Sequence, residues 1–328
     1  MLTDVIQTLP QVIVDGLTLG AVYAVIAIGY TMVYGILELI NFAHGEIFMT
    51  GAFIGTAILL TFSGIGWLSA MPAIIVLIIV LIATSILTGF LGMGIERVAY
   101  RPLRNAPKLI TLITAIGISF LLQDIIRFIA EVKKGNYIIT GPSLFTGKMK
   151  LEASSLWPQF HDASFKSTFL VVLITAIIMM LVLDLFVNHT KWGMAIRAVA
   201  QDRDTAALMT INVNKVISVT FFVGSALGGA TGVLFAVQYG TIDPYIGFIL
   251  GIKAFTAAVL GGIGNIRGAM VGGMVIGMLE MFAAANLSGL TGGVFGAEYK
   301  DVFAFIILIV VLIFKPEGLF GKAAVEKV

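Results

Sequence analysis

The sequence predicts an all-α, polytopic helical membrane protein with about eight or nine transmembrane helices and a cytoplasmic C-terminus. Of its 328 residues, 59% are hydrophobic and only 12% are charged, whereas soluble domains carry about 25% charged residues. The apolar residues fall in long blocks, and residues 71–91 carry no charge over a length that spans a bilayer. Runs such as 303–314 lack the alternation of a β-barrel, so the blocks are expected to be helices.

Blocks of low charge define nine candidate spans in chain order. They cover residues 11–34, 47–62, 70–94, 109–130, 168–187, 216–239, 249–263, 270–287 and 302–315. Three of them are short for a perpendicular crossing, so tilt, extension or a break is expected there. If residues 35–62 form one broken or re-entrant element, the count becomes eight. The spans are expected to make a single transmembrane domain over residues 1–328.

Lysine and arginine residues gather in every second connection. The basic connections follow the third, fifth and seventh spans and the last one, with Arg97, Arg101, Arg104, Lys108, Lys191, Arg197, Arg203, Lys215, Arg267, Lys315, Lys322 and Lys327. The connection at 62–70, in contrast, has no charge. Because short cytoplasmic loops are enriched in Lys and Arg, the basic connections and the C-terminus are expected inside. The N-terminus then lies outside if the first two blocks both span.

The connection at residues 131–167 is the longest on the predicted outer side. It contains two prolines and five lysines, and long loops translocate largely regardless of charge. A loop of this length is often functional or forms a small folded element. We expect an extracytoplasmic docking or covering segment.

The connection at residues 188–215 is predicted to be a cytoplasmic coupling loop. Ala195, Val199 and Leu208 form short apolar stripes within it. Asp202 is placed to cap a short helix through Leu208, and Asp204 in the first turn suits the helix dipole. The helix either joins two spans at the surface or docks in a groove of a cytoplasmic partner.

Several kinds of chemistry find no support in the sequence. There is no cysteine and there are only three widely separated histidines, so no metal site, cofactor or nucleophilic active site is expected. The glycines near residue 264 do not match GxGxxG, and residues 141–148 have one residue too many for a P-loop. The chain is therefore expected to be neither an enzyme nor a nucleotide-binding subunit, and no nucleic-acid partner is expected.

Glycines repeat every four residues near the eighth block. Gly264, Gly268 and Gly272 form one row, and Gly273 and Gly277 start another. Small residues at this spacing let helices approach closely in lipid. The rows predict helix packing.

Two groups of polar residues are candidates for the translocation pathway. Lys253 and Glu280 lie within apolar blocks, where a lone charge is costly, so we hypothesise that they pair, either near the pathway or as a structural salt bridge. Asn41, His44 and Glu46 follow the first long block. Broken helices often line substrate cavities, although a histidine here could equally cap a helix end.

Three segments in the same order resemble a known family. Residues 41–53 (NFAHGEIFMTGAF), 193–216 and 259–273 (VLGGIGNIRGAMVGG) resemble the LivH-type permeases of branched-chain amino-acid ABC importers, and the resemblance covers essentially the whole chain. It implies a bacterial-type inner membrane and alternating access. It also implies a second, LivM-like permease subunit, two cytoplasmic ATPase subunits and an extracytoplasmic substrate-binding protein.

The resemblance also implies an ATPase-coupling segment at Gly193–Lys215. Its candidate coupling residues are Gly193, Arg197, Asp202, Arg203, Ala206 and Ala207. Thr210 departs from the family, whose members often have glycine there.

The resemblance favours branched-chain amino acids as substrate and a pair of different permease subunits, but the residues themselves fix neither. Related permeases for urea or short amides remain an alternative. A self-sufficient ion-coupled transporter, with Lys253 and Glu280 as its ion site, is another.

Overall fold

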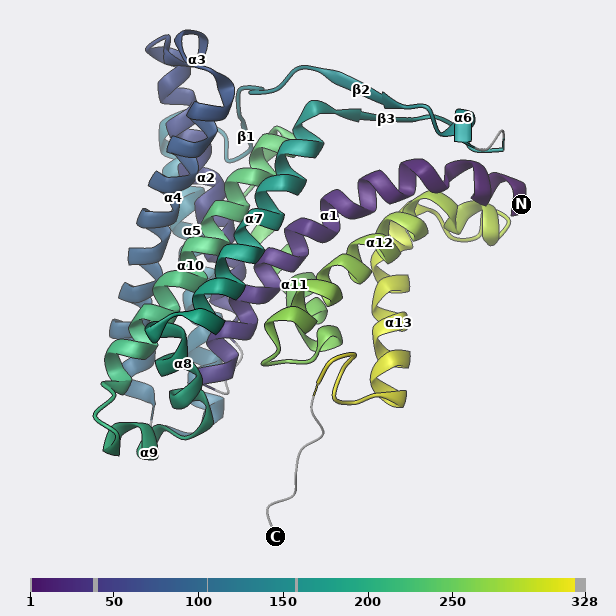
Figure 1. Ribbon diagram of the computed structural model, residues 1–328. Coiled ribbons are helices and arrows are strands. Elements are labelled where there is room, and N and C mark those ends of the chain that lie inside the picture. Colours follow the sequence, from purple (N-terminus) through teal and green to yellow (C-terminus); the bar gives the residue numbers. More distant parts are fainter. Residues whose placement is uncertain (1, 38–40, 105, 157–158, 322–328) are drawn as a thin grey trace.

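The computed structural model describes residues 2–37, 41–104, 106–156 and 159–321 (Figure 1). Within these ranges, nine helices of 15 residues or more coincide with the nine predicted blocks. They are α1 (Leu2–Leu37), α2 (Ala43–Gly64), α4 (Ala73–Ile95), α5 (Lys108–Lys134), α7 (Ser167–His189), α10 (Val213–Tyr239), α11 (Ile246–Gly261), α12 (Ile266–Leu290) and α13 (Lys300–Phe314).

The helices make the chain a polytopic membrane protein. In the described part of the chain, seven are long and apolar enough to cross a bilayer, and α11 is a shorter apolar helix. The second predicted block, 47–62, was drawn too short because His44 and Glu46 lower the local hydropathy. Helix α2 nevertheless begins at Ala43 and runs unbroken for 22 residues. It is a helix distinct from α1, which ends at Leu37.

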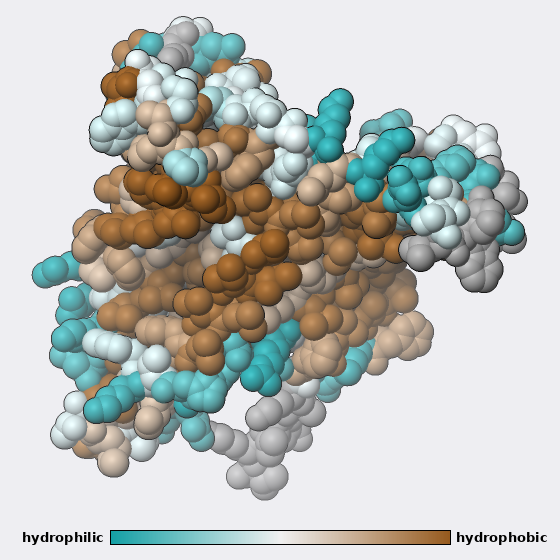
Figure 2. Space-filling model, turned by 45° about the horizontal axis from the view of Figure 1, so that its top comes forward, coloured by the Kyte–Doolittle hydropathy of each residue, from teal (hydrophilic) through white to brown (hydrophobic). Residues whose placement is uncertain are grey.

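Helix α1 occupies the interior of the bundle. It runs obliquely through the molecule beside α12 (Figure 1), and 83% of its most apolar window is buried, against 22% for α5 and 28% for α7. Helix α10 packs mainly against α4 and α2. Figure 2 shows an apolar band with polar residues at its two ends. The apolar outer surfaces of α4, α5 and α7 suit a lipid environment.

Short elements lie at the two ends of the bundle (Figure 1). One end carries α3 (Trp67–Ala70), α6 (Ala153–Leu156) and an antiparallel hairpin of β2 (Lys148–Leu151) with β3 (Ala163–Lys166). Strand β1 (Ile139–Thr140) pairs there with β4 (Thr241–Ile242). The long connection at 131–167 therefore folds locally and is tied to the α10–α11 turn.

The opposite end carries the short helices of the basic connections. They are the π-helix η1 (Glu96–Tyr100), the 3₁₀ helix η2 (Arg101–Leu103), α8 (Lys191–Gln201) and α9 (Arg203–Leu208). A further 3₁₀ turn, η3 (Ala297–Tyr299), precedes α13.

Two of the three glycines in the first predicted row lie at a close helix crossing. A Cβ on Gly268 or Gly272 would overlap the α11 main chain at Gly261 or Ala257. The prediction for Gly264 is wrong: this residue has a φ of +89° and nothing within 4 Å of a built Cβ. The four-residue spacing of the glycines continues into the turn before α12, so Gly264 lies outside the helix. Asn265 caps α12 there by accepting from the Gly268 amide at 3.1 Å.

The second glycine row joins α12 to α1. A Cβ on Gly273 would overlap Ala24, and one on Gly277 would overlap Gly20. This contact brings the main chains of two helices together, as small residues do in membranes. It also sets which side chains of α1 meet those of α12.

The last described residues return to the end of α11. The Leu319 amide donates to the Leu260 carbonyl at 2.7 Å, and the Phe320 amide donates to the Gly261 carbonyl at 3.0 Å. Helix ends leave carbonyl groups without intrahelical partners. The chain after α13 therefore supplies the hydrogen bonds that complete α11.

Candidate coupling segment and buried polar clusters

The predicted coupling segment folds as two helices, α8 and α9. The Thr190 hydroxyl accepts from the Gly193 amide at 3.0 Å and caps α8. Asp202 has extended backbone angles and separates the helices. Its Oδ1 accepts from the amides of Asp204 at 2.9 Å and Thr205 at 3.1 Å. The predicted cap at Asp202 and the helix through Leu208 are therefore confirmed.

Four of the predicted coupling residues face the bundle. Gly193 lies against the last carbonyl groups of α7, and Arg197 donates to the Val187 carbonyl. Arg203 donates to the Ile36 carbonyl near the end of α1. Ala206 is buried. These side chains hold the segment against α7 and α1, and a cation is favoured at a helix C-terminus.

The outer face of the segment is apolar. Met194, Leu208 and Met209 are 61%, 85% and 70% exposed, and the predicted residues Asp202 and Ala207 are exposed beside them. The predicted apolar stripes include Leu208 but not Met194. Large exposed apolar side chains at the end of a membrane bundle are typical of a protein contact.

Thr210 ends α9 in an unusual conformation. Its φ of +65° makes it the one non-glycine residue in the left-handed region within the described ranges. The turn lets the Ile211 amide donate to the Ala206 carbonyl at 3.1 Å, which satisfies the helix end. A β-branched residue is strained here. The departure from glycine therefore falls where glycine would fit best.

The first buried group is the α2 polar cluster. Its members are Asn41, His44, Glu46, Tyr30, Tyr100 and Ser119. The predicted pathway residues Asn41, His44 and Glu46 are 5%, 1% and 1% exposed. Tyr100 donates to Asn41 Oδ1 at 2.6 Å, and Ser119 donates to Glu46 Oε1 at 3.2 Å. The structure thus brings all three predicted residues into the interior.

Glycines surround the α2 polar cluster. The His44 ring lies between Gly29 of α1 and Gly228 of α10, and its centroid is 4.8 Å from that of Tyr30. The Glu46 carboxylate lies against Gly247 of α11. Side chains at these positions would fill the space that the polar groups occupy.

Several polar atoms of the cluster are buried without a hydrogen bond. Within the described ranges, Asn41 Nδ2, Glu46 Oε2 and both His44 ring nitrogens have no partner of good geometry, and the His44 ring lies toward the Ile26 main chain. The alternative expectation is that His44 caps a helix end, but in the described part of the chain its ring nitrogens make no hydrogen bond of that kind. A buried polar atom without a partner costs roughly 1–3 kcal/mol, so the cluster is not built for stability alone.

The second buried group, the charge cluster, consists of Lys253, Glu280, Lys300, Asp301 and Tyr23. The predicted pair is present, with Lys253 Nζ 2.8 Å from Glu280 Oε1. Lys300 Nζ is 3.0 Å from the same oxygen, and Lys253 Nζ is 2.7 Å from Asp301 Oδ1. Tyr23 of α1 donates to Glu280 Oε2 at 2.8 Å. Two cations and two carboxylates therefore balance.

Some members of both clusters were not predicted. Lys300 and Asp301 lie outside the nine predicted blocks, and Tyr23 and Ser119 lie within apolar blocks that do not mark them out. A charge inside the membrane must be neutralised. This requirement is the sequence signal that could have led to the further partners of Lys253 and Glu280.

A polytopic bundle with an appended helical segment and buried polar clusters defines a multi-pass membrane protein. Its residues 12–312 match the sequence profile of the family described as "Branched-chain amino acid transport system / permease component". The chain belongs to this family of multi-pass inner-membrane permeases.

Named relatives span nearly the same length. The high-affinity branched-chain amino acid transport system permease proteins LivH of Escherichia coli K12 and BraD of Pseudomonas aeruginosa are each 43% identical over 97% of both chains. The probable branched-chain amino acid transport permease protein LivH of Methanocaldococcus jannaschii is 28% identical, over 90% of this chain and 87% of its own. No solved structure matches the chain.

Proposed function

We propose that the chain is a permease subunit of an ABC importer that moves branched-chain amino acids into the cell. The observation that carries the proposal is the 43% identity to LivH and BraD over 97% of the chain. The exposed apolar face of α8 and α9 adds a surface suited to a partner protein. Energy comes from two ATPase subunits, because the chain has no nucleotide-binding motif of its own.

The end with α8 and α9 faces the cytoplasm. The enrichment of Lys and Arg in the connections at this end supports the orientation. The opposite end, with the β2–β3 hairpin within residues 131–167, faces outward and receives the substrate-binding protein. A second, LivM-like permease completes the membrane pore, and the two subunits form one transmembrane unit per complex.

Alternating access follows from movement of the coupling segment. The ATPases contact the outer face at Met194, Ala207 and Leu208, and their closure displaces α8 and α9. Arg197 and Arg203 are bonded to the ends of α7 and α1, so the displacement reaches both spans. The bundle thereby opens alternately to each side.

The α2 polar cluster lines the substrate route in this mechanism. An amino acid crossing the membrane carries an ammonium and a carboxylate group that must exchange water for polar partners. Asn41 Nδ2 and Glu46 Oε2 are buried and unpaired within the described ranges, so they offer a donor and an acceptor. The surrounding glycines of α1, α10 and α11 allow those helices to move apart without side-chain obstruction.

Reconstitution in proteoliposomes tests the proposal. The chain is assembled with its second permease, ATPases and binding protein, and uptake of labelled leucine is measured with and without ATP. We expect uptake only with the complete assembly and ATP. Uptake by the chain alone, driven by a proton or sodium gradient, would contradict the proposal and favour an ion-coupled carrier. Urea uptake in place of leucine would contradict the substrate.

Variants of the outer face test the coupling assignment. Leu208→Asp places a charge on the apolar face, and we expect it to reduce co-purification of the ATPases. Val98→Asp is the matched control, since Val98 is 78% exposed at the same end but outside the segment. Equal ATPase recovery with both variants would show that α8 and α9 are not the docking site.

A further inference from the structure

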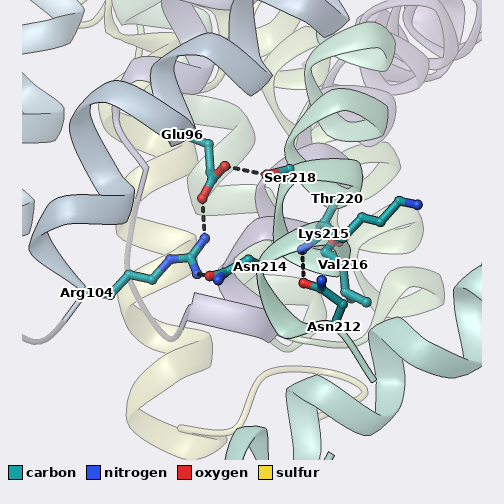
Figure 3. A network of polar contacts seen from close by, with 8 residues as sticks. All are labelled: Glu96, Arg104, Asn212, Asn214, Lys215, Val216, Ser218 and Thr220. Carbon is teal, nitrogen blue, oxygen red and sulfur yellow. Dashed lines mark hydrogen bonds and ion pairs between the residues drawn. The ribbon is translucent and has the colours of Figure 1, made fainter. Parts of the chain in front are cut away.

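The π-helix η1 joins the start of α10 to the start of α2. It continues α4 directly and is followed by η2. Single π-helical turns are rare in proteins, and those that occur are often found at functional sites. We define the η1 network as Glu96, Tyr100 and Arg104 together with their partners Asn41, Asn214 and Ser218, and Figure 3 shows the part of it that meets α10.

Glu96 is the centre of the network. Its side chain is fully buried and pairs with Arg104 through Oε1. Its Oε2 accepts from the Ser218 hydroxyl of α10 at 2.6 Å. Arg104 also donates to Asn214 in the first turn of α10 (Figure 3). Burial raises the strength of these charge-assisted bonds, so the η1 end of α4 and the start of α10 are held together.

The start of α10 is directly joined to the coupling segment. Only residues 209–212 separate α9 from α10, and Asn212 caps α10 by accepting from the Lys215 amide at 3.0 Å (Figure 3). Glycines of α4 pack α10 closely: a Cβ on Gly92 would overlap Ser225. A displacement of α9 therefore reaches η1 through short, bonded contacts.

Tyr100 connects η1 to the α2 polar cluster. Its hydroxyl, on a side chain that is 3% exposed, donates to Asn41 Oδ1 at 2.6 Å. Its ring lies 5.5 Å from the Phe221 ring of α10, centroid to centroid. Arg203 of α9 donates a hydrogen bond to the Ile36 carbonyl near the end of α1. The end of α1 is thus bonded to the coupling segment, and the start of α2 is bonded to η1.

A cavity separates these elements. It has a volume of about 430 Å³ and lies between the coupling segment, η1 and the end of α1, lined among others by Tyr100, Arg104, Val199 and Arg203. Packed interiors leave little room for movement, whereas this space lets α8 and α9 approach η1.

We infer that the η1 network is the positioning device that transmits movement of the coupling segment to the α2 polar cluster. The inference rests on the proposed function, in which α8 and α9 receive the ATPases. Glu96 and Arg104 couple η1 to α10, and Tyr100 passes the displacement to Asn41. Glu96 and Arg104 lie outside the α2 polar cluster, and Tyr100 is the member of that cluster through which the network meets it.

The test measures ATP hydrolysis and leucine uptake together in the reconstituted importer. Glu96→Gln removes the buried charge, and Tyr100→Phe removes only the hydroxyl. We expect both variants to assemble and to hydrolyse ATP, while the ATP consumed per leucine rises roughly fivefold or more, the lower end of allosteric coupling effects. An unchanged ratio in both variants would overturn the inference.

Two conservative variants serve as matched controls. Asp124→Asn alters a carboxylate whose side chain is 65% exposed in an ion pair with Arg127. Tyr299→Phe removes a hydroxyl from a residue that is 43% exposed. Both should keep the wild-type ratio of ATP to leucine. A wild-type complex without leucine uptake would instead refute the proposed function.

A distance measurement tests the link without depending on transport. The chain has no native cysteine, so spin labels at Val98→Cys in η1 and Asp204→Cys in α9 are unique in this subunit. In the assembled complex we expect one narrow distance distribution, which Glu96→Gln broadens and Asp124→Asn does not. An equally narrow distribution with Glu96→Gln would contradict the inference.

Discussion

The two buried polar clusters differ in how completely their groups are paired. In the charge cluster, Lys253, Glu280, Lys300 and Asp301 balance, and Tyr23 donates to the second oxygen of Glu280. Among the described residues, Asp301 Oδ1 has no hydrogen bond of good geometry, but it forms an ion pair with Lys253. In the α2 polar cluster, Glu46 has one bonded and one unbonded oxygen. The central carboxylates of the two clusters, Glu46 and Glu280, are only 1% and 2% exposed. A difference in burial therefore does not explain the difference in pairing.

From this difference we infer a structural role for the charge cluster and a transport role for the α2 polar cluster. A paired network fixes the positions of helices α1, α11, α12 and α13 relative to each other. Unpaired buried atoms lower stability and are retained where a ligand can use them. We propose on this basis that the charge cluster holds the bundle together and that the α2 polar cluster lines the substrate route.

The largest expected effect comes from breaking the charge cluster on one side. Glu280→Leu leaves Lys253 and Lys300 against the single carboxylate of Asp301. Removing one partner of a buried pair typically costs about 3–5 kcal/mol, so we expect little folded protein in membranes. Thermal unfolding of detergent-solubilised protein measures the loss. The double variant Lys253→Met with Glu280→Leu restores the balance and should recover most of the stability; a double variant as unstable as the single would contradict the pairing.

A smaller loss is expected from the glycine contact that brings Tyr23 to Glu280. Gly277→Leu forces α12 away from Gly20 of α1, and overpacking of this kind costs about 1–3 kcal/mol. Thermal unfolding is again the measurement. Gly289→Leu is the matched control on the same helix, because nothing lies within 4 Å of its built Cβ. Equal losses for the two variants would indicate a general intolerance of α12.

The α2 polar cluster should respond in transport rather than in stability. Glu46→Gln keeps the shape of the side chain and removes its charge, so the melting temperature should change little. We expect leucine uptake to fall roughly tenfold, equivalent to about 1.4 kcal/mol in the transition state. Ser119→Ala, which removes only the donor to Oε1, should reduce uptake less. Wild-type uptake with Glu46→Gln would move the substrate route elsewhere.

The smallest effect concerns strain outside both clusters. Thr210→Gly relieves a left-handed conformation that costs a β-branched residue about 1–3 kcal/mol, offset by the greater unfolded-state entropy of glycine. We expect a net gain of about 1 kcal/mol in unfolding free energy, measured by thermal denaturation. Thr210→Val retains the strain and should give no gain. A loss of stability with glycine would show that the threonine side chain contributes to the fold.

The helices could be predicted from the sequence because apolar blocks are a local signal. All nine blocks became helices, and the cap at Asp202 followed from its side chain alone. Contacts between segments far apart in the sequence have no local signal of this kind, so they could not be predicted. The partners Tyr100 and Ser119 lie 59 and 73 residues from Asn41 and Glu46, and only the folded bundle brings them together.

Pairing rules predicted part of the site, and the glycine spacing rule failed in the turn before α12 begins. A lone charge in an apolar block demands an opposite charge, so Lys253 could be matched with Glu280. Lys300 and Asp301 were missed because they precede the last block rather than interrupt it. The error at Gly264 arose because a four-residue repeat carries no information on where α12 begins.

The return of the C-terminal segment to α11 has a consequence for synthesis in the membrane. Helix α11 is only 16 residues long and contains Lys253, whose insertion is unfavourable by about 2.5–3.5 kcal/mol at mid-depth. Its ionic partners Glu280 and Asp301, and the amides of Leu319 and Phe320 that complete its end, are all translated later. We therefore expect α11 to reach its final position only after the residues up to Phe320 have been translated. Nascent chains halted before residue 300 should leave it accessible to membrane proteases.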